Sequence, residues 1–453
     1  MVTLSFRPSK RACRAGAILL LVGGLLAAQV ARARGSGAPR SFAAGHILVH
    51  YRGDPGEKHV GVKADETVAG ALNRLRSDPA IGYAHPDYLV TAARFHPNDP
   101  GTDGRGGWIR DQWNFLPPTR VAGGIGTPGG WQRLIADRHP GGEGTTVAVL
   151  DTGVAYRDKG SRYRRDPDLP SKKRFVHPKD FVDDDTVPLD IDGHGTHVTS
   201  TIAQSTDNGL GLTGIAYGVK VMPIRVLNRH ETGKGSDVAR GIGFATEHGA
   251  DVINLSLDFK PEVRHCEEIV SVCHAIQHAN HEGVTVVAAA GNDAMASVSY
   301  PAAAKGVIAT GATTYRACPA EYSNYGEMLD IVAPGGGTDK SFNVTGDAAC
   351  QPDAQGYEVR QYSLLPEAAE NGDFGKFGIV GLEGTSMASA HVSGVAALVI
   401  ASGICGSHPP PRRVAHRLKE TAIDRGAARS DDLYGDGLLD ATRATSPRTN
   451  CGP

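Results

Sequence analysis

The sequence predicts an α/β fold with a doubly wound, mostly parallel sheet, which a small α+β domain precedes. Over most of the chain, short apolar runs that are typical of buried strands alternate with segments of helical periodicity. The strand-like runs lie at 146–150, 219–226, 252–256, 284–289, 307–311 and 330–333. Helical patterns separate most of them, including 236–248 and 267–281. From 336 to 381 the alternation breaks, and we expect a long irregular stretch there.

The smaller domain is predicted for residues 34–95. Apolar residues alternate between 47 and 51, which indicates a strand, and a turn with a further strand is expected at 78–90. Between them lies a helix face, capped by Asp65 or Thr67, at Val68, Leu72 and Leu75. Residues 96–109 are rich in Gly, Pro and Asp, so we expect a linker before the α/β domain at 110–453.

Length and charge set the broad class of the protein. The chain has 453 residues and a formal net charge of −2. That length supports one large core together with a small extra domain. Because positive and negative charges nearly balance, the sequence does not favour nucleic acid or an acidic membrane as a partner, and we expect a monomer.

The first 33 residues have the pattern of a signal peptide. Basic residues, among them Arg11 and Arg14, precede an apolar run at 15–30, and Ala31-Arg-Ala33 matches a cleavage signal. A membrane anchor is the alternative, but about 16 apolar residues are short for a membrane span. We therefore expect this segment to be removed and the rest of the chain to be secreted.

Three short motifs place reactive side chains beside predicted strand and helix ends. Asp151 follows the run 146–150, so it lies at the carboxyl edge of the predicted sheet, where such sheets bind ligands. His194 stands between two glycines at a predicted helix start, and Ser386 opens a run of small residues that also indicates a helix. A serine hydroxyl becomes a nucleophile when a histidine takes its proton and a carboxylate orients that histidine. The helix dipole at Ser386 would favour a developing oxyanion.

A fourth motif supplies a donor for that oxyanion. Asn292 follows the strand-like run 284–289, and its amide could act together with the backbone N–H of Ser386. Taken singly, each of these residues has a structural alternative as a cap, a turn residue or a packing residue. Their occurrence together, in the order Asp, His, Ser, favours catalysis. We interpret the nearby His197 and His391 as packing or hydrogen-bonding residues.

The four motifs resemble those of the subtilisin-like serine proteases, the subtilases, over roughly residues 110–445. They read Asp151-Thr-Gly, His194-Gly-Thr-His, Ala-Gly-Asn292 and Gly-Thr-Ser386-Met-Ala. The resemblance implies a subtilisin-like fold and a serine endopeptidase that cleaves proteins and peptides through an acyl-enzyme intermediate. It assigns Asp151 as the orienting carboxylate, His194 as base and acid, Ser386 as nucleophile and Asn292 as oxyanion donor.

The same resemblance implies that residues 34–95 are a propeptide. In the subtilases such a segment assists folding and then inhibits the enzyme, and we expect it to have a ferredoxin-like fold. The position of the segment between a signal peptide and the enzyme supports this interpretation. A permanent accessory domain is the alternative.

Matching positions also indicate where a peptide substrate would bind. By resemblance, the segments that flank the peptide and form its first specificity pocket include Gly233, Gly235, Ser256, Leu257, Asp258, Ala289, Gly291 and Ser299. The small walls favour medium to large apolar side chains. The chain departs from the family at Asp258, where glycine is usual, and this acid could favour basic residues or point to solvent. A second departure, Ala390 in place of proline, is compatible with the same helix.

The cysteines suggest three disulfides. Seven are present, and Cys13 would leave with the signal peptide, so a secreted chain would keep an even number. We favour Cys318 with Cys350, which flank the insertion, and Cys405 with Cys451, which would tie the tail to the last domain helix. The remaining pair is Cys266 and Cys273, which would be about 10 Å apart in one regular helix. We therefore expect Cys266 in the loop before that helix.

A structural calcium ion is also suggested by the resemblance, whereas the chemistry requires no cofactor. The loop at 207–214 resembles one that wraps calcium in many subtilases, with Asn208 and Asp168 at ligand positions. Oxygen ligands of this kind suit Ca²⁺. A turn with a solvated acid is the alternative.

Two other functions fit parts of the sequence. A secreted pseudoenzyme could bind peptides in the same groove without cutting them, although all four catalytic residues are present. A lipase or esterase on an α/β-hydrolase fold would need a G-x-S-x-G elbow, and Gly384-Thr-Ser-Met-Ala388 lacks the last glycine. The sequence therefore favours a serine endopeptidase.

Overall fold

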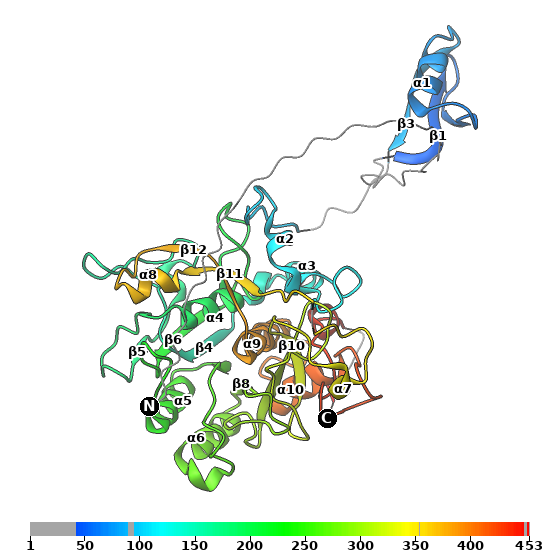
Figure 1. Ribbon diagram of the computed structural model, residues 1–453. Helices are drawn as coiled ribbons and strands as arrows, with labels where there is room; N and C mark the ends of the chain where they lie inside the picture. Colours follow the sequence, from blue (N-terminus) through cyan, green and yellow to red (C-terminus); the bar gives the residue numbers. More distant parts are fainter. Residues whose placement is uncertain (1–41, 89–94, 353, 448–450, 453) are drawn as a thin grey trace, which may run out of the picture. The chain divides into compact units, whose positions relative to one another are not determined.

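The computed structural model describes residues 42–88, 95–352, 354–447 and 451–452. The expected signal peptide, residues 1–33, lies outside these ranges. The chain divides into two compact units, Met1–Ala93 and Arg94–Pro453 (Figure 1). Within the described ranges, no helix is long and apolar enough to cross a membrane.

The first unit is a three-stranded antiparallel sheet, in the order β2-β1-β3, with one helix. Its elements are β1 (Phe42–Tyr51), β2 (Glu57–Gly61), α1 (Val68–Arg76) and β3 (Ile81–Tyr88). Strand β2 was not predicted, because Glu57, Lys58 and His59 give it little apolar content. A ferredoxin-like fold has a second helix and a fourth strand. That detail of the expected fold therefore stays a prediction.

The hydrophobic core of the first unit lies between its helix and its sheet. Leu72 and Leu75 of α1 are buried with Ile47 and Val49 of β1, as the apolar periodicity predicted. Thr67 caps the helix, since its hydroxyl accepts a hydrogen bond from the N–H of Gly70 at 3.1 Å. The unit has its own small core, and α1 begins where its cap predicts.

The second unit is built on a seven-stranded sheet in the order β10-β9-β8-β7-β4-β6-β5. Every pair of neighbouring strands is parallel, so the predicted doubly wound sheet is confirmed. The strands are β4 (Thr146–Asp151), β5 (Lys179–Asp180), β6 (Lys220–Arg225), β7 (Val252–Leu255), β8 (Thr285–Ala289), β9 (Val307–Thr313) and β10 (Ile331–Pro334).

Helices cover both faces of this sheet (Figure 1). One layer contains α5 (Gly235–Glu247) and α6 (Val270–His281); the other contains α4 (His194–Ala203), α9 (Thr385–Ala401) and α10 (Pro411–Glu420). The shorter helices are α2 (Trp108–Asp111), α3 (Thr127–Ala136), α7 (Phe342–Thr345), α8 (Pro366–Glu370) and α11 (Ala441–Ala444). Alternate side chains of β4 pack on opposite faces of the sheet. Val147 and Val149 belong to the core under α9, and Ala148 and Leu150 belong to the core under α5.

The insertion at 336–381 is more regular than we expected. It contains α7, α8 and an antiparallel pair, β11 (Val359–Leu364) and β12 (Phe377–Leu382). Ser200 of α4 and Gln204, the residue that caps its C-terminus, both donate hydrogen bonds to the carbonyl of Tyr362, at 3.0 and 2.8 Å. The insertion therefore packs against the helix that begins at His194.

The expected linker at 96–109 packs as part of the second unit. The N–H of Asn98 donates to the Asp207 carboxylate at 3.0 Å, and that of Gly101 donates to the carbonyl of Gly211 at 2.9 Å. Trp108 is buried. The Gly, Pro and Asp residues of this segment thus form turns that fold against the loop 207–214.

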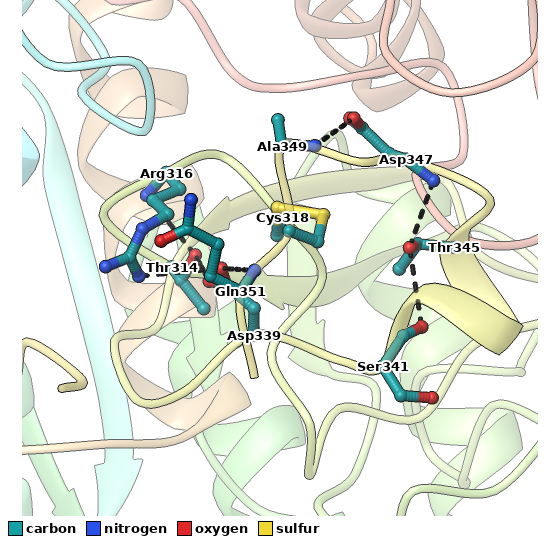
Figure 2. The surroundings of a disulfide bond; sticks show 10 residues. Thr314, Arg316, Cys318, Asp339, Ser341, Thr345, Asp347, Ala349 and Gln351 are labelled. Carbon is teal, nitrogen blue, oxygen red and sulfur yellow. Dashed lines mark hydrogen bonds and ion pairs between the residues drawn. A yellow bond between two sulfur atoms is a disulfide. The ribbon is translucent and has the colours of Figure 1, made fainter. Parts of the chain in front are cut away.

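All three expected disulfides are present, joining Cys266 to Cys273, Cys318 to Cys350 and Cys405 to Cys451. Cys266 lies in a short 3-10 turn before α6, as the distance argument required. Figure 2 shows the surroundings of the Cys318 bond. There the buried carboxylate of Asp339 accepts hydrogen bonds from the Thr314 hydroxyl at 2.5 Å and the Gln351 N–H at 2.7 Å.

Candidate active site

The four predicted catalytic residues meet at the carboxyl edge of the sheet. Asp151 is the last residue of β4, and Asn292 follows the end of β8. His194 is the first residue of α4, and Ser386 is the second residue of α9. His194, Asn292 and Ser386 line one cavity, and Asp151 lies behind His194. Such an edge is where open α/β sheets bind ligands.

Asp151 holds His194 from behind. The Nδ1 atom of His194 lies 2.7 Å from Oδ1 of Asp151, and the aspartate is fully buried. A carboxylate at that distance accepts, so Nδ1 carries the proton and Nε2 is left as the base. Burial lowers the pKa of His194, but the charge and hydrogen bond of Asp151 outweigh burial and raise the pKa above its ordinary value, with smaller contributions from Glu231 and Asp192.

A glycine next to His194 makes this approach possible. A Cβ atom on Gly195 would lie 2.2 Å from the carbonyl oxygen of Gly153 and 3.0 Å from Oδ1 of Asp151. The Gly195 N–H instead donates to the Thr152 hydroxyl at 2.9 Å. Helix α4 can therefore begin directly against the end of β4.

Ser386 is held at the first turn of α9. Its side chain is 9% exposed, and its hydroxyl donates to the carbonyl of Ser256 at 3.3 Å. The hydroxyl of Ser256 in turn donates to the carbonyl of Ser386 at 2.8 Å. The Ser386 hydroxyl thus donates to Ser256 and not to His194. Catalytic hydrogen bonds are often long without substrate and tighten when it binds.

Thr385 sets the orientation of Asn292. The backbone N–H and the hydroxyl of Thr385 both donate to Oδ1 of Asn292, each at 2.9 Å. With its oxygen held in this way, the amide presents Nδ2 as its donor side. Sequence reasoning did not assign Thr385 a role, although it stands directly before Ser386 in the quoted motif.

The cavity beside these residues has a volume of about 260 Å³. Its lining contains the predicted substrate-binding residues Gly233, Gly235, Ser256, Leu257, Asp258 and Ala289. The other two predicted residues lie behind the wall, where Gly291 donates to the Thr385 hydroxyl at 3.3 Å and Ser299 donates to the carbonyl of Ala290 at 2.8 Å. The lining also contains residues that we did not predict, chiefly Glu231, Lys234, Phe259 and Lys260.

Comparison with known proteins agrees with this geometry. Residues 142–437 match the model of the subtilase family. The chain belongs to the subtilase family. A thermophilic serine proteinase of Bacillus sp. (strain AK1) is 34% identical over 337 residues, which cover 74% of this chain and 67% of that protein. Subtilisin Savinase of Lederbergia lenta is 34% identical over 304 residues, covering 67% of this chain and 91% of that protein.

Solved structures agree with the same assignment. A protease from Pseudoalteromonas arctica PAMC 21717 aligns with a TM-score of 0.60 and 29% sequence identity, covering 78% of this chain and 99% of that one. This subtilase is therefore a serine endopeptidase with the α/β fold of its family.

Two further histidines of this subtilase serve the packing around the site. The Nε2 atom of His197 lies 3.1 Å from the carbonyl of Val359, and Nδ1 of His391 lies 2.7 Å from the carbonyl of Met387. Burial lowers the pKa of His197 to about 3 and that of His391 to about 4. Both are neutral at physiological pH, and His197 ties α4 to the insertion strand β11.

The two predicted calcium ligands lie side by side. The Asn208 amide donates to Oδ1 of Asp168 at 2.8 Å, and the Leu212 N–H donates to Oδ2 at 3.0 Å. Burial raises the pKa of Asp168 to about 8. Protein donors thus occupy both oxygens of this carboxylate, and the described part of the chain has no group of three or more His, Cys, Asp or Glu arranged to hold a metal. Calcium binding at this pair therefore stays a prediction.

Proposed function

We propose that this subtilase is a secreted endopeptidase that is made as a preproenzyme and processes itself. The observation that carries the proposal is the bond between Asp151 and His194, which supports a base beside the cavity that Ser386 and Asn292 also line. Its substrates are proteins and peptides, as in the family. Residues 1–33 would act as the signal peptide and residues 34–95 as the propeptide that inhibits the enzyme.

The proposed reaction has two steps. The Oγ atom of Ser386 attacks the scissile carbonyl while Nε2 of His194 takes its proton, and Asp151 stabilises the imidazolium that forms. The oxyanion receives hydrogen bonds from Nδ2 of Asn292 and the N–H of Ser386, at the positive end of the dipole of α9. His194 then protonates the leaving amine as the C–N bond breaks, and water hydrolyses the acyl-enzyme with His194 again as the base.

The substitution Ser386→Ala tests the nucleophile. We expect kcat to fall by about 10⁶ and the propeptide to remain attached, because no other activated hydroxyl is available for acyl transfer. A serine-directed covalent reagent should label the unmodified enzyme and not the variant. Normal turnover or normal maturation of the variant would contradict the proposal, and an unlabelled, inactive unmodified protein would favour a peptide-binding pseudoenzyme.

The substitution Asn292→Ala tests the oxyanion donor. We expect kcat to fall by about 10² to 10³ with little change in KM, because the amide acts mainly on the transition state. Steady-state kinetics on a peptide substrate measure both constants. An unchanged kcat would mean that Asn292 only positions Thr385.

Structural calcium bound by Asp168 and Asn208 stays a prediction from the resemblance. It would stabilise the loop 207–214 and would take no part in the chemistry. Adding calcium to chelator-treated enzyme should raise the temperature of thermal unfolding if the prediction is right.

A further inference from the structure

Asp258 is exposed and lines the substrate cavity, and the residues on either side of it fix its backbone there. Two positions before it, the carbonyl of Ser256 accepts the hydrogen bond of the Ser386 hydroxyl. One position after it, the N–H of Phe259 donates to the carbonyl of Tyr300 at 2.7 Å. The segment that carries Asp258 therefore spans the space between the nucleophile and the segment of Ser299. Asp258 lines the cavity together with Ser386.

The surroundings of Asp258 suit a long basic side chain. The cavity walls near it include the apolar groups of Leu257, Phe259 and Val238, which can pack against the methylene stem of a lysine or arginine. Ser299, whose hydroxyl accepts a hydrogen bond from Asn324 at 3.0 Å, lies close enough to influence the Asp258 carboxyl.

The charges around Asp258 also favour a cation. Partial burial and the negative charge of Asp293 raise the pKa of Asp258, whereas Lys260 and the Ser299 hydroxyl lower it. A cationic side chain beside Asp258 would offset the negative charge of Asp293 and replace lost hydration. Lys260 opposes this effect from the same cavity wall, and solvent screens both charges because Asp258 and Lys260 are both exposed. A basic side chain that enters the cavity would displace part of that solvent and bring its charge closer to Asp258 than Lys260 can screen.

We propose that Asp258 makes this enzyme specific for substrates with lysine or arginine immediately before the scissile bond. The proposal rests on the proposed function, because it assumes that Ser386 is the nucleophile beside this cavity. It decides between the two alternatives that the sequence left open for Asp258, and it replaces the apolar preference that the small walls suggested.

The sequence at the boundary of the two units agrees with such a preference. The six residues after Tyr88 read Leu-Val-Thr-Ala-Ala-Arg, so Arg94 is the only basic residue among them. The second unit begins with Arg94 itself. If the enzyme cuts its own chain at this boundary, a basic residue stands where Asp258 would bind it.

The experiment compares kcat/KM for matched peptides that differ only in arginine or leucine before the cleaved bond. We expect the unmodified enzyme to prefer arginine, and Asp258→Asn to lower the arginine-to-leucine ratio by about 10- to 100-fold, as for the loss of one charge-assisted hydrogen bond. The conservative Asp258→Glu variant should keep most of the ratio. Glu143→Gln, which removes an acid before the opposite, amino end of β4, is the matched control and should leave the ratio unchanged.

The outcomes separate this proposal from the proposed function. A serine-directed reagent counts the active sites of each variant, so misfolded protein does not enter the ratio. Preference for leucine in the unmodified enzyme, or an unchanged ratio in Asp258→Asn, would overturn the specificity while leaving the protease intact. If the unmodified enzyme cleaves neither peptide and the reagent does not label it, the proposed function is overturned instead.

Discussion

The pKa of His194 determines the pH at which the active site can work. His194 accepts a proton from Ser386 only while it is neutral, so kcat/KM should rise as the pH rises through the His194 pKa. Asp151 raises that pKa and Glu231 raises it further. The acid limb of the profile should therefore lie above the ordinary histidine value of about 6.5.

Removing the charge of Glu231 tests this argument. Because Glu231→Gln lowers the His194 pKa, we expect the acid limb of kcat/KM to move to lower pH. The shift should shrink at high salt, because Glu231 is exposed to solvent. The pH profile of Glu282→Gln, an exposed acid just after the end of α6, provides the control. An unchanged profile in Glu231→Gln would mean that this charge does not reach His194.

At this scale the sequence indicated the positions of the candidate catalytic residues better than the residues that surround them. The motifs around Asp151, His194 and Ser386 placed each residue at an element end, and the structure brings them to one edge. Glu231 could not be predicted, because it lies in an irregular loop with a φ of +52° and reaches the cavity only through tertiary folding.

The loop that the disulfide between Cys318 and Cys350 closes contacts the start of α9, the helix that carries Ser386. Within that loop, the carbonyl of Gly335 accepts a hydrogen bond from the N–H of Gly384 at 3.0 Å. Gly384 is the N-cap residue of α9, two residues before Ser386. A loop that loses its anchor should therefore disturb the start of the catalytic helix.

We expect the double variant Cys318→Ser/Cys350→Ser to lose activity faster on heating than the unmodified enzyme. In the loop-entropy model, a separation of 32 residues corresponds to roughly 3 to 4 kcal/mol of stabilisation. The matched control is Cys266→Ser/Cys273→Ser, whose separation of 7 residues corresponds to about 2 to 2.5 kcal/mol. Equal rates of thermal inactivation in the Cys318 variant and the unmodified enzyme would show that the bond does not support the site.

Strong periodicity explains which elements could be predicted. The buried strands β4, β7, β8 and β9 are mostly apolar, and their predicted bounds lie within about two residues of the observed ones. Strands β11 and β12 were missed because Arg360 and Gln361 interrupt the first and Gly378 and Gly381 weaken the second. The sequence of 96–109 predicts only a linker because its partner, the loop 207–214, is distant in sequence.

At the scale of the whole molecule, we expect maturation at the boundary between the two units, as the proposed preproenzyme would require. The N–H of Phe95 donates to the side-chain oxygen of Gln132 at 2.9 Å, and its ring lies against Trp131 and Tyr217. Asp99, fully buried, accepts hydrogen bonds from the N–H groups of Asp207 and Asn208. A cut after Phe95 would remove the Phe95 contacts, and a cut after Asp99 would also remove those of Asp99, so we expect the cut to fall before Phe95.

We predict that the mature enzyme begins at Phe95, after cleavage between Arg94 and Phe95. An amino group at Phe95 could still donate to Gln132, so the cut would leave the second unit intact, whereas a cut after Arg105 would remove Asp99. Intact-mass and N-terminal analysis of active enzyme measure the site. Arg94→Gln should slow maturation because Asp258 loses its cationic partner, and Arg105→Gln, at an exposed basic residue of the second unit, should not. A first residue other than Phe95 would contradict the prediction. Fully active enzyme with residues 42–88 still attached would also contradict it and would favour a permanent accessory domain.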